Sequence, residues 1–91
     1  MLHPTTTTLF EKDKKKALKQ SKNMSRLAEV MKKLIEERPL EPKYCDHPLK
    51  GEWKGFRDCH VENDWVLIYK VVKEEKRIIF ARLGSHSELF K

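Results

Sequence analysis

The sequence predicts an α+β fold, with two N-terminal antiparallel helices packed on one face of a twisted antiparallel sheet of about four strands. Two observations indicate this class. The first half of the chain holds two segments with helical apolar spacing, and the second half holds strand-like segments joined by short polar turns. Because 91 residues suffice for one modest core, we expect a single domain over residues 1–91.

The N-terminal segment predicts an extended stretch followed by a helix. The threonines of residues 5–8 are β-branched and favour extended backbone, which allows an outer strand. Thr8 and Glu11 have the spacing of a capping box, in which each side chain satisfies a backbone donor of the other residue. This pattern predicts a first helix from about Leu9 to Ser21.

A second helix is predicted after Asn23, which is a favourable N-cap residue. Pro39 marks its end, because the residue before proline avoids helical geometry. A short linker makes the two helices an antiparallel pair. The core-facing positions follow helical spacing at Met24, Leu27, Ala28, Met31, Leu34 and Ile35.

The second half of the chain predicts an antiparallel meander. Residues 65–72 are apolar at odd and even positions alike, as in a central strand covered on both faces. Strands are also expected over residues 53–60 and 77–83, with a polar hairpin turn at 73–76. Residues 39–51 contain three prolines and end at a glycine, which predicts a loop.

The positive charge is concentrated in the first half. Residues 1–43 hold 11 Lys and Arg against 6 Asp and Glu, a net charge of +5, whereas residues 44–91 hold 9 against 8, a net charge of +1. Such an excess attracts polyanions. Five lysines fall on one stripe of the first helix, which is either a solvated face or a surface that binds phosphates. They are Lys12, Lys15, Lys16, Lys19 and Lys22.

Side chains capable of acid–base chemistry gather in the second half. The predicted meander brings them to one end of the sheet. Metal-free RNA cleavage requires a base for the ribose 2′-OH, an acid for the departing 5′ oxygen and a cation for the phosphate. Histidine serves as acid or base near neutral pH, and arginine provides a fork for phosphate. The candidate residues are His47, His60, Asp64, Arg82 and His86.

The C-terminal residues complete this candidate site. In a straight strand, Arg82 and His86 would lie about 13 Å apart at ~3.3 Å per residue. Gly84 between them permits a bulge or bend that returns His86 toward Arg82. Phe90 offers a ring for stacking on an unpaired base. Each residue also has a structural alternative, as a surface histidine, a turn aspartate, a sheet-face arginine or a core phenylalanine.

Other classes of site fit less well. Cys45, His47, Cys59 and His60 provide enough ligand atoms for zinc, but they lack the paired cysteine knuckle of structural zinc sites. No segment resembles the helix and oxyanion turn of a cysteine nucleophile. We therefore expect no metal and reduced thiols. No apolar run approaches the ~18 residues of a membrane helix, and no secretory signal is apparent, so we expect a cytoplasmic protein without a membrane partner.

A long motif runs over residues 46–62, Asp-His-Pro-Leu-Lys-Gly-Glu-Trp-Lys-Gly-Phe-Arg-Asp-Cys-His-Val-Glu. It is followed by Asp-Trp at 64–65, by Leu-Ile-Tyr at 67–69, and by Arg-x-Gly-x-His at 82–86 with a final Leu-Phe. These motifs resemble the YafQ branch of the RelE/ParE toxin superfamily over about Pro39 to Phe90. Asn63 replaces an expected proline, and Ser85 with Ser87-Glu88 departs from the pattern, which leaves codon preference open.

The resemblance implies a bacterial type II toxin with a RelE-like microbial ribonuclease fold. It implies a ribosome-dependent endoribonuclease without a cofactor, whose partners are a cognate antitoxin, ribosomal RNA and translated mRNA, with operator DNA bound only through the antitoxin complex. The lysine stripe would then contact the ribosome. By position, the catalytic histidines are His47, His60 and His86, the acidic residue is Asp64, the phosphate ligand is Arg82, and Trp65 and Phe90 contact the substrate.

Two roles and two functions stay open at this point. We expect His86 to be the general acid, whereas His47, His60 and Asp64 are all candidates for the base. A gyrase-poisoning toxin of the same fold, as in the ParE branch, is the main alternative function. A nucleic-acid-binding module without catalysis is another. The several histidines argue against the gyrase poison, because that activity needs no acid–base pair.

Overall fold

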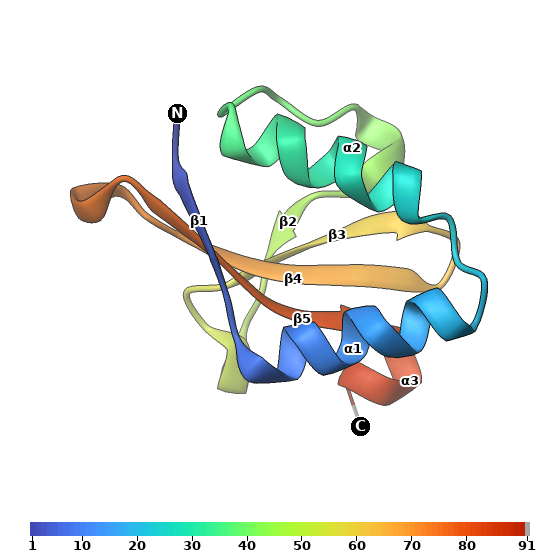
Figure 1. Cartoon of the computed structure of the whole chain (residues 1–91). Coiled ribbons are helices and arrows are strands. Elements are labelled where there is room, and N and C mark those ends of the chain that lie inside the picture. The colour runs from blue at the N-terminus through green and yellow to red at the C-terminus, as the bar shows by residue number, and fades with distance from the viewer. Residues whose placement is uncertain (91) are drawn as a thin grey trace.

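A computed structural model of the chain describes residues 1–90. Within this range, five strands form one sheet in the order β1-β5-β4-β3-β2 (Figure 1). The predicted α+β class is confirmed, with one strand more than the four or so expected. The strands are β1 (His3–Thr6), β2 (His47–Pro48), β3 (Arg57–Glu62), β4 (Trp65–Val72) and β5 (Arg77–Gly84).

The sheet is mixed, whereas the sequence predicts an antiparallel one. β1 pairs with β5 in parallel, and all other neighbours are antiparallel. The expected outer strand at the threonine-rich N-terminus is present. Parallel pairing is possible because both helices and three strands separate β1 from β5 along the chain, and parallel neighbours need a connection of a dozen or more residues.

The helix α1 (Thr8–Lys19) begins one residue before the predicted start. Thr7, and not Thr8, is its N-cap, and the Thr7 hydroxyl accepts a hydrogen bond from the Phe10 backbone N–H at 3.0 Å. The same hydroxyl donates to the Ala81 carbonyl of β5 at 2.7 Å. The predicted capping box of Thr8 and Glu11 is therefore wrong, because the contact with β5 selects one threonine from a run of four.

Both helices end in a left-handed residue rather than at a proline. α2 (Met24–Ile35) begins after Asn23 as predicted, and the Asn23 side chain accepts from the Arg26 N–H at 3.0 Å. It stops well before Pro39, because Glu37 has a φ of 59° and the Arg38 N–H bonds the Lys33 carbonyl at 2.9 Å. This is a Schellman motif. α1 ends in the same way, with Ser21 at a φ of 57°.

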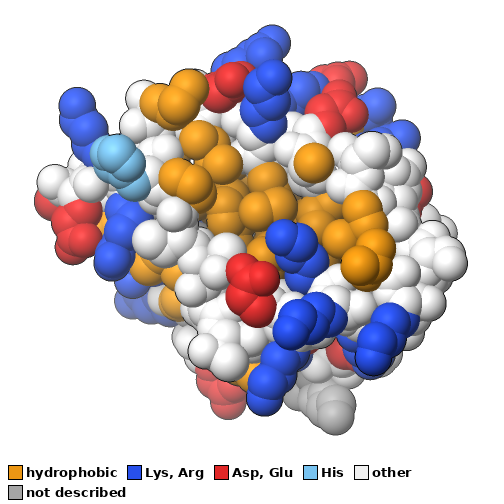
Figure 2. All heavy atoms as spheres, viewed as in Figure 1, with side chains coloured by type: hydrophobic (Ala, Val, Ile, Leu, Met, Phe, Trp, Pro, Cys, Tyr) orange, Lys and Arg blue, Asp and Glu red, His pale blue; other side chains and the backbone are white. Residues whose placement is uncertain are grey.

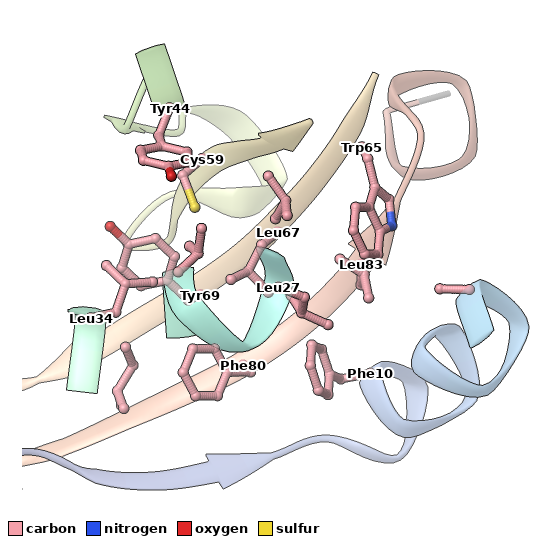
Figure 3. Packing of buried hydrophobic residues seen from close by; sticks show 14 of the residues in the cluster. Phe10, Leu27, Leu34, Tyr44, Cys59, Trp65, Leu67, Tyr69, Phe80 and Leu83 are labelled. Carbon is pink, nitrogen blue, oxygen red and sulfur yellow. The ribbon is translucent and has the colours of Figure 1, made fainter. Parts of the chain in front are cut away.

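Both helices cover one face of the sheet and run in opposite directions (Figure 1). Figure 3 shows Phe10 of α1 and Leu27 of α2 pointing toward Phe80 of β5 and Leu67 of β4. Leu27 and Leu34 are buried, as the helical spacing predicts, whereas Met24, Met31 and Ile35 are only partly buried. These three side chains line an apolar groove beside α2, and Figure 2 shows apolar side chains gathered on this side of the molecule.

The central strand β4 has the predicted bounds and is buried on both faces. Val66 and Ile68 point away from the helices, into a second apolar cluster. Trp53, Phe56 and Leu89 belong to this cluster. The residues between β2 and β3 and a short C-terminal helix, α3 (His86–Leu89), therefore cover the face that α1 and α2 leave open.

The connecting segments contain more regular structure than predicted. The loop over residues 39–51 contains a 3₁₀ turn at Pro42–Tyr44 and the two-residue strand β2, and another 3₁₀ turn spans Gly51–Trp53. β3 therefore begins at Arg57 instead of Trp53. The polar hairpin between β4 and β5 is confirmed, with a 3₁₀ turn at Lys73–Glu75. No helix within residues 1–90 has the length and apolar composition needed to cross a bilayer.

Thr7→Ala should lower the free energy of unfolding by about 1–2 kcal/mol, because it removes the N-cap of α1. Thr8→Ala is the matched control and should change the stability by less than about 0.5 kcal/mol, as for most surface substitutions. Urea unfolding followed by circular dichroism measures both. A larger loss for Thr8→Ala would contradict the assigned cap.

Candidate active site

The candidate site lies on the sheet face opposite the two helices. His47 of β2 is in register with Asp58 of β3, and Asp58 is in register with Ile68 of β4. His60 follows Asp58 by two residues and pairs with Val66. Because residues in register share a face and alternate residues of a strand do so too, these three polar side chains emerge on one side.

A short helix brings His86 back over this face. Ser85 is the N-cap of α3, its hydroxyl accepts from the Glu88 N–H, and the Glu88 carboxylate accepts from the Ser85 N–H at 2.9 Å. Lys16 of α1 forms an ion pair with Glu88. The hydrogen bond from Lys16 and that from the Ser85 N–H together lower the pKa of Glu88 to about 2. The capping box therefore fixes the turn that the sequence predicts at Gly84.

Gly84 has a role other than the predicted bend. It ends β5 in a backbone conformation open to any residue, because it is not among the glycines with positive φ. A Cβ at this position would lie 3.1 Å from Glu88 Oε1 and 3.4 Å from Leu89 Cδ2. The missing side chain thus lets α3 pack against the strand end. The expected irregularity of β5 exists, but it lies earlier, beside Ala81, where the register with β4 shifts.

His86 is held by the carboxylate of Asp64, in the turn between β3 and β4. Asp64 Oδ1 accepts from the His86 backbone N–H at 3.0 Å and lies 2.7 Å from His86 Nδ1. These two hydrogen bonds lower the pKa of the Asp64 carboxyl. A carboxylate only accepts, so Nδ1 carries a proton and Nε2 is left for a substrate. This contact fixes the imidazole orientation.

Two further rings flank His86. The ring centroids of His60 and His86 lie 4.9 Å apart at an interplanar angle of 79°. The Phe90 ring centroid lies 6.1 Å from that of His86, and Phe90 is 37% exposed. The structure therefore brings together four of the predicted residues: His60, Asp64, His86 and Phe90.

His47 approaches the same face through Asp58, a residue that the sequence patterns do not single out. Asp58 is 2% exposed, and His47 Nε2 lies 2.8 Å from its Oδ1. Burial raises the pKa of the Asp58 carboxyl, although His47, His60 and His86 pull it downward. Within residues 1–90, this oxygen accepts no well-aligned hydrogen bond, so its contact with His47 is essentially electrostatic.

The His47 ring is oriented by two contacts. His47 Nδ1 lies 3.1 Å from the Pro48 carbonyl, which can only accept, so Nδ1 is the donor. Nε2 is the nitrogen that approaches the Asp58 carboxylate, at 2.8 Å from Oδ1. The position of the ring therefore depends on the register of β2 with β3.

Arg82 is placed differently from the prediction. Its guanidinium bonds Asp13 of α1, with Nε to Oδ2 at 2.8 Å and Nη2 to Oδ1 at 3.3 Å. Asp13 Oδ2 also accepts from the Leu83 backbone N–H at 3.0 Å. The hydrogen bond to Asp13 raises the pKa of Arg82. The fork is thus rigid and partly neutralised, and its Nη1 donors take no part in these contacts.

Known proteins have similar sequences and the same fold. The model of a family described as the bacterial toxin of type II toxin–antitoxin systems, YafQ, matches residues 2–91. The chain belongs to the YafQ family. The mRNA interferase toxin YafQ of Escherichia coli K12 is 49% identical over 82 residues, which cover 89% of this chain and 87% of that protein.

Solved structures of YafQ proteins confirm the fold. The Escherichia coli toxin in a DinJ–YafQ complex superposes with a TM-score of 0.91 at 43% identity and covers 100% of both chains. A metal-bound toxin from Helicobacter pylori has a TM-score of 0.93 at 47% identity and covers 99% of this chain and 100% of that one. The resemblance inferred from the sequence motifs is therefore confirmed.

Not every residue predicted from the YafQ resemblance is accessible. Trp65 is 2% exposed and packs in the helix-side core, so it does not offer a ring for stacking in this structure. The Lys22 amine lies 6.0 Å from the centre of its ring. The predicted lysine stripe is exposed throughout, although Lys16 is engaged with Glu88.

Cys59 lies on the opposite face of the sheet from the neighbouring His60. Cys59 is buried in the helix-side core, and burial raises the pKa of its thiol, whereas Cys45 is exposed. Across the described residues 1–90, no three His, Cys, Asp or Glu side chains are arranged to hold a metal ion.

Asp58→Asn should change the pH dependence of stability. Because folding raises the pKa of this carboxyl, the folded state holds the proton more tightly, and the stability contributed by Asp58 falls as pH rises from about 4 through the folded-state pKa. The asparagine does not show this decrease. We therefore expect the free energy of unfolding of the variant, relative to wild type, to increase with pH across that window.

Urea unfolding at a series of pH values measures the difference. Glu62→Gln, on the same strand but less buried, is the control and should show a flat difference. A flat difference for Asp58→Asn as well would contradict the assigned effect of burial.

Proposed function

We propose that this YafQ-family chain is an endoribonuclease toxin that cleaves mRNA on the ribosome with acid–base chemistry from its own side chains. The endoribonuclease class follows from mRNA interferase relatives at 49% identity over most of the chain. The observation that carries the mechanism is the placement of His86, whose Nδ1 is fixed by Asp64 and whose ring packs against His60.

His86 is the general acid in this proposal. The Asp64 carboxylate stabilises a positive charge on the ring and directs Nε2 outward. The Nε2 proton then passes to the 5′ oxygen as its bond to phosphorus breaks. A group so oriented contributes about 10²–10⁴-fold to the rate.

His60 is the general base. Asp64 is occupied by His86, and His47 is occupied by Asp58 and the Pro48 carbonyl. His60 has no such partner in the part of the chain that the structure describes, and it lies next to His86. Its ring nitrogen takes the proton of the 2′-OH while the oxygen attacks phosphorus, so the products are a 2′,3′-cyclic phosphate and a free 5′-OH. After the step, His60 carries the proton of the 2′-OH and His86 has given up its Nε2 proton.

The remaining residues bind the substrate and orient the pair. His47, which contacts Asp58, adds a further imidazole on this face that can donate to or accept from the substrate. The Nη1 donors of Arg82 provide a second, fixed contact for the RNA backbone. Phe90 is partly exposed beside His86 and can stack on a splayed base, which is worth about 1–3 kcal/mol.

The partners follow from charge and from the relatives. The exposed lysine stripe of α1 lies in the half of the chain with a net charge of +5 and fits the phosphates of ribosomal RNA. A YafQ relative is found in a complex with DinJ, so we expect a cognate antitoxin for this chain too. Operator DNA would be bound through that complex. We expect the protein to act in the cytoplasm, where translated mRNA is found.

His86→Ala should reduce mRNA cleavage by about 10²–10⁴-fold, because it removes the general acid. The test maps mRNA 5′ ends in a translating extract. His3→Ala, in the exposed part of β1, is the matched control and should cleave like wild type. Equal cleavage by His86→Ala would refute the mechanism, and intact mRNA with wild-type protein but blocked DNA supercoiling would favour a gyrase poison.

Reversing charge at Lys15 and Lys19 should weaken ribosome binding and lower its salt dependence by roughly one unit of slope for each phosphate that the variant no longer neutralises. The double variant Lys15→Glu, Lys19→Glu is compared with Lys73→Glu, Lys76→Glu at the β4–β5 hairpin. Co-sedimentation with ribosomes across a salt series gives both slopes, and thermal melting verifies the fold. Equal ribosome binding by the two double variants would contradict the proposal that the lysine stripe of α1 contacts ribosomal RNA.

A further inference from the structure

We infer that the cavity between α1 and α3 is a binding site for an unpaired nucleobase of the substrate RNA, next to the cleavage position. This inference rests on the proposed function. It adds a specificity site, with Gln20 and Ser87 as the residues that read the base edge. Neither residue belongs to the acid–base set.

The cavity has a volume of about 440 Å³ and lies between the second half of α1, the start of β4 and the turn into α3. This size is within the range of about 300–1,000 Å³ of small-molecule sites. Ala17, Trp65 and Leu83 form a buried apolar floor. Polar groups surround the floor, as in sites where apolar contact provides affinity and a few hydrogen bonds provide selectivity.

The cavity adjoins the catalytic residues through Asp64. The Asp64 carboxylate lines the cavity and also lies 2.7 Å from His86 Nδ1. Ser85, Ser87 and Glu88 face the cavity, whereas His86 and Phe90 of the same segment do not line it. α3 therefore contributes to both sites, with Ser87 and Glu88 at the cavity and His86 at the histidine site. An RNA strand cleaved at His86 passes within reach of the cavity.

The charges of the lining favour a base over a phosphate. Asp13 is paired with Arg82, and Lys16 is paired with Glu88. Asp64 is held by His86. The charged residues in the lining are three carboxylates and three cations, so the cavity offers no net positive charge to an anion. A lining without net positive charge gives a phosphate no electrostatic advantage, whereas a neutral base does not need one.

Uncharged donors and acceptors are available to read the base. The hydrogen bonds that order the α3 wall use Ser85, Ser87 and Glu88, and the Gln20 amide takes part in none of them. An amide presents a donor beside an acceptor and can pair bidentately with a base edge. The Ser87 hydroxyl lies 3.2 Å from that of Ser85 and can rotate to donate or accept. Lys22 stands over Trp65 at the rim.

The first experiment measures sequence preference. Wild type, Gln20→Leu, Ser87→Ala and the control Leu18→Ala act on a reporter mRNA library with varied codons in a translating extract, and the 5′ ends are sequenced. Leu18 is 65% exposed on the same helix and does not line the cavity. We expect Gln20→Leu to change the relative cutting of different bases at one position by at least about fivefold, the lower range for removing a bidentate pair. Leu18→Ala should retain the wild-type preference.

The second experiment does not depend on cleavage. The free protein, labelled with ¹⁵N, is titrated with 2′-O-methyl trinucleotides, which lack the attacking hydroxyl. Base binding should shift the Gln20 side-chain amide and the Ser87 backbone amide in the NMR spectrum more than the amides of the β4–β5 hairpin.

The two experiments separate the cavity from the mechanism. An unchanged cutting preference in both cavity variants, or a uniform loss at all sites, would overturn the base site while the nuclease assignment stands. An inactive wild type would overturn the proposed function, and the titration alone would then decide the cavity. If neither cavity amide shifts with RNA, the inference is wrong.

Discussion

The outer edge of β5 is completed by side chains of α1 and its cap in place of a full strand, and this constraint places the rest of the site. β1 pairs with β5 only as far as Phe80. Beyond it, the Thr7 hydroxyl donates to the Ala81 carbonyl, and the Asp13 carboxylate accepts from the Leu83 N–H. Backbone N–H and C=O groups beside a buried core need hydrogen-bond partners, so these contacts hold α1 along β5. The Asp13 carboxylate also orients Arg82. β5 then ends at Gly84, which places Ser85 at the start of α3.

The two faces of the sheet have separate tasks. The helix-side face holds most of the large apolar side chains and supplies the stability of the fold. The opposite face has a smaller apolar cluster and carries the histidines. Asp58 bears the cost of this arrangement, because its carboxylate is almost fully removed from water without an aligned hydrogen bond. Burying such a group lowers the stability of the folded state. Its position among three histidines is typical of a functional site.

Sequence reasoning succeeds where one pattern has one explanation. β4 was predictable to the residue because apolar side chains at both parities require cover on both faces. Asn23 was predictable as a cap because it stands directly before the apolar stripe of α2, which begins at Met24. The α1 cap failed because four consecutive threonines offer equivalent choices, and only the distant Ala81 carbonyl distinguishes Thr7.

The candidate site was predictable in its members but not in its contacts. Asp58 was missed because its position in an alternating strand resembles a solvated one, and its contact with His47 depends on the register of a two-residue strand. The partner of Arg82 lies 69 residues away. The turn into α3 had a readable signal in the capping-box spacing of Ser85 and Glu88, although the neighbouring glycine suggested a bend of its own.

The two carboxylates that support His86 and its helix stay ionised across the neutral pH range. The pKa of Glu88 is held near 2 by Lys16 and the Ser85 N–H, and that of Asp64 is lowered by its bonds to His86. Because both pKa values are depressed by folding, the stability that these carboxylates provide is complete above their unfolded pKa values and is lost only as pH falls toward the folded ones. α3 is therefore fully supported across the neutral range in which histidines ordinarily titrate. A change of cleavage rate in that range therefore does not arise from loss of the contacts that Glu88 and Asp64 make, because both carboxylates keep their charge throughout.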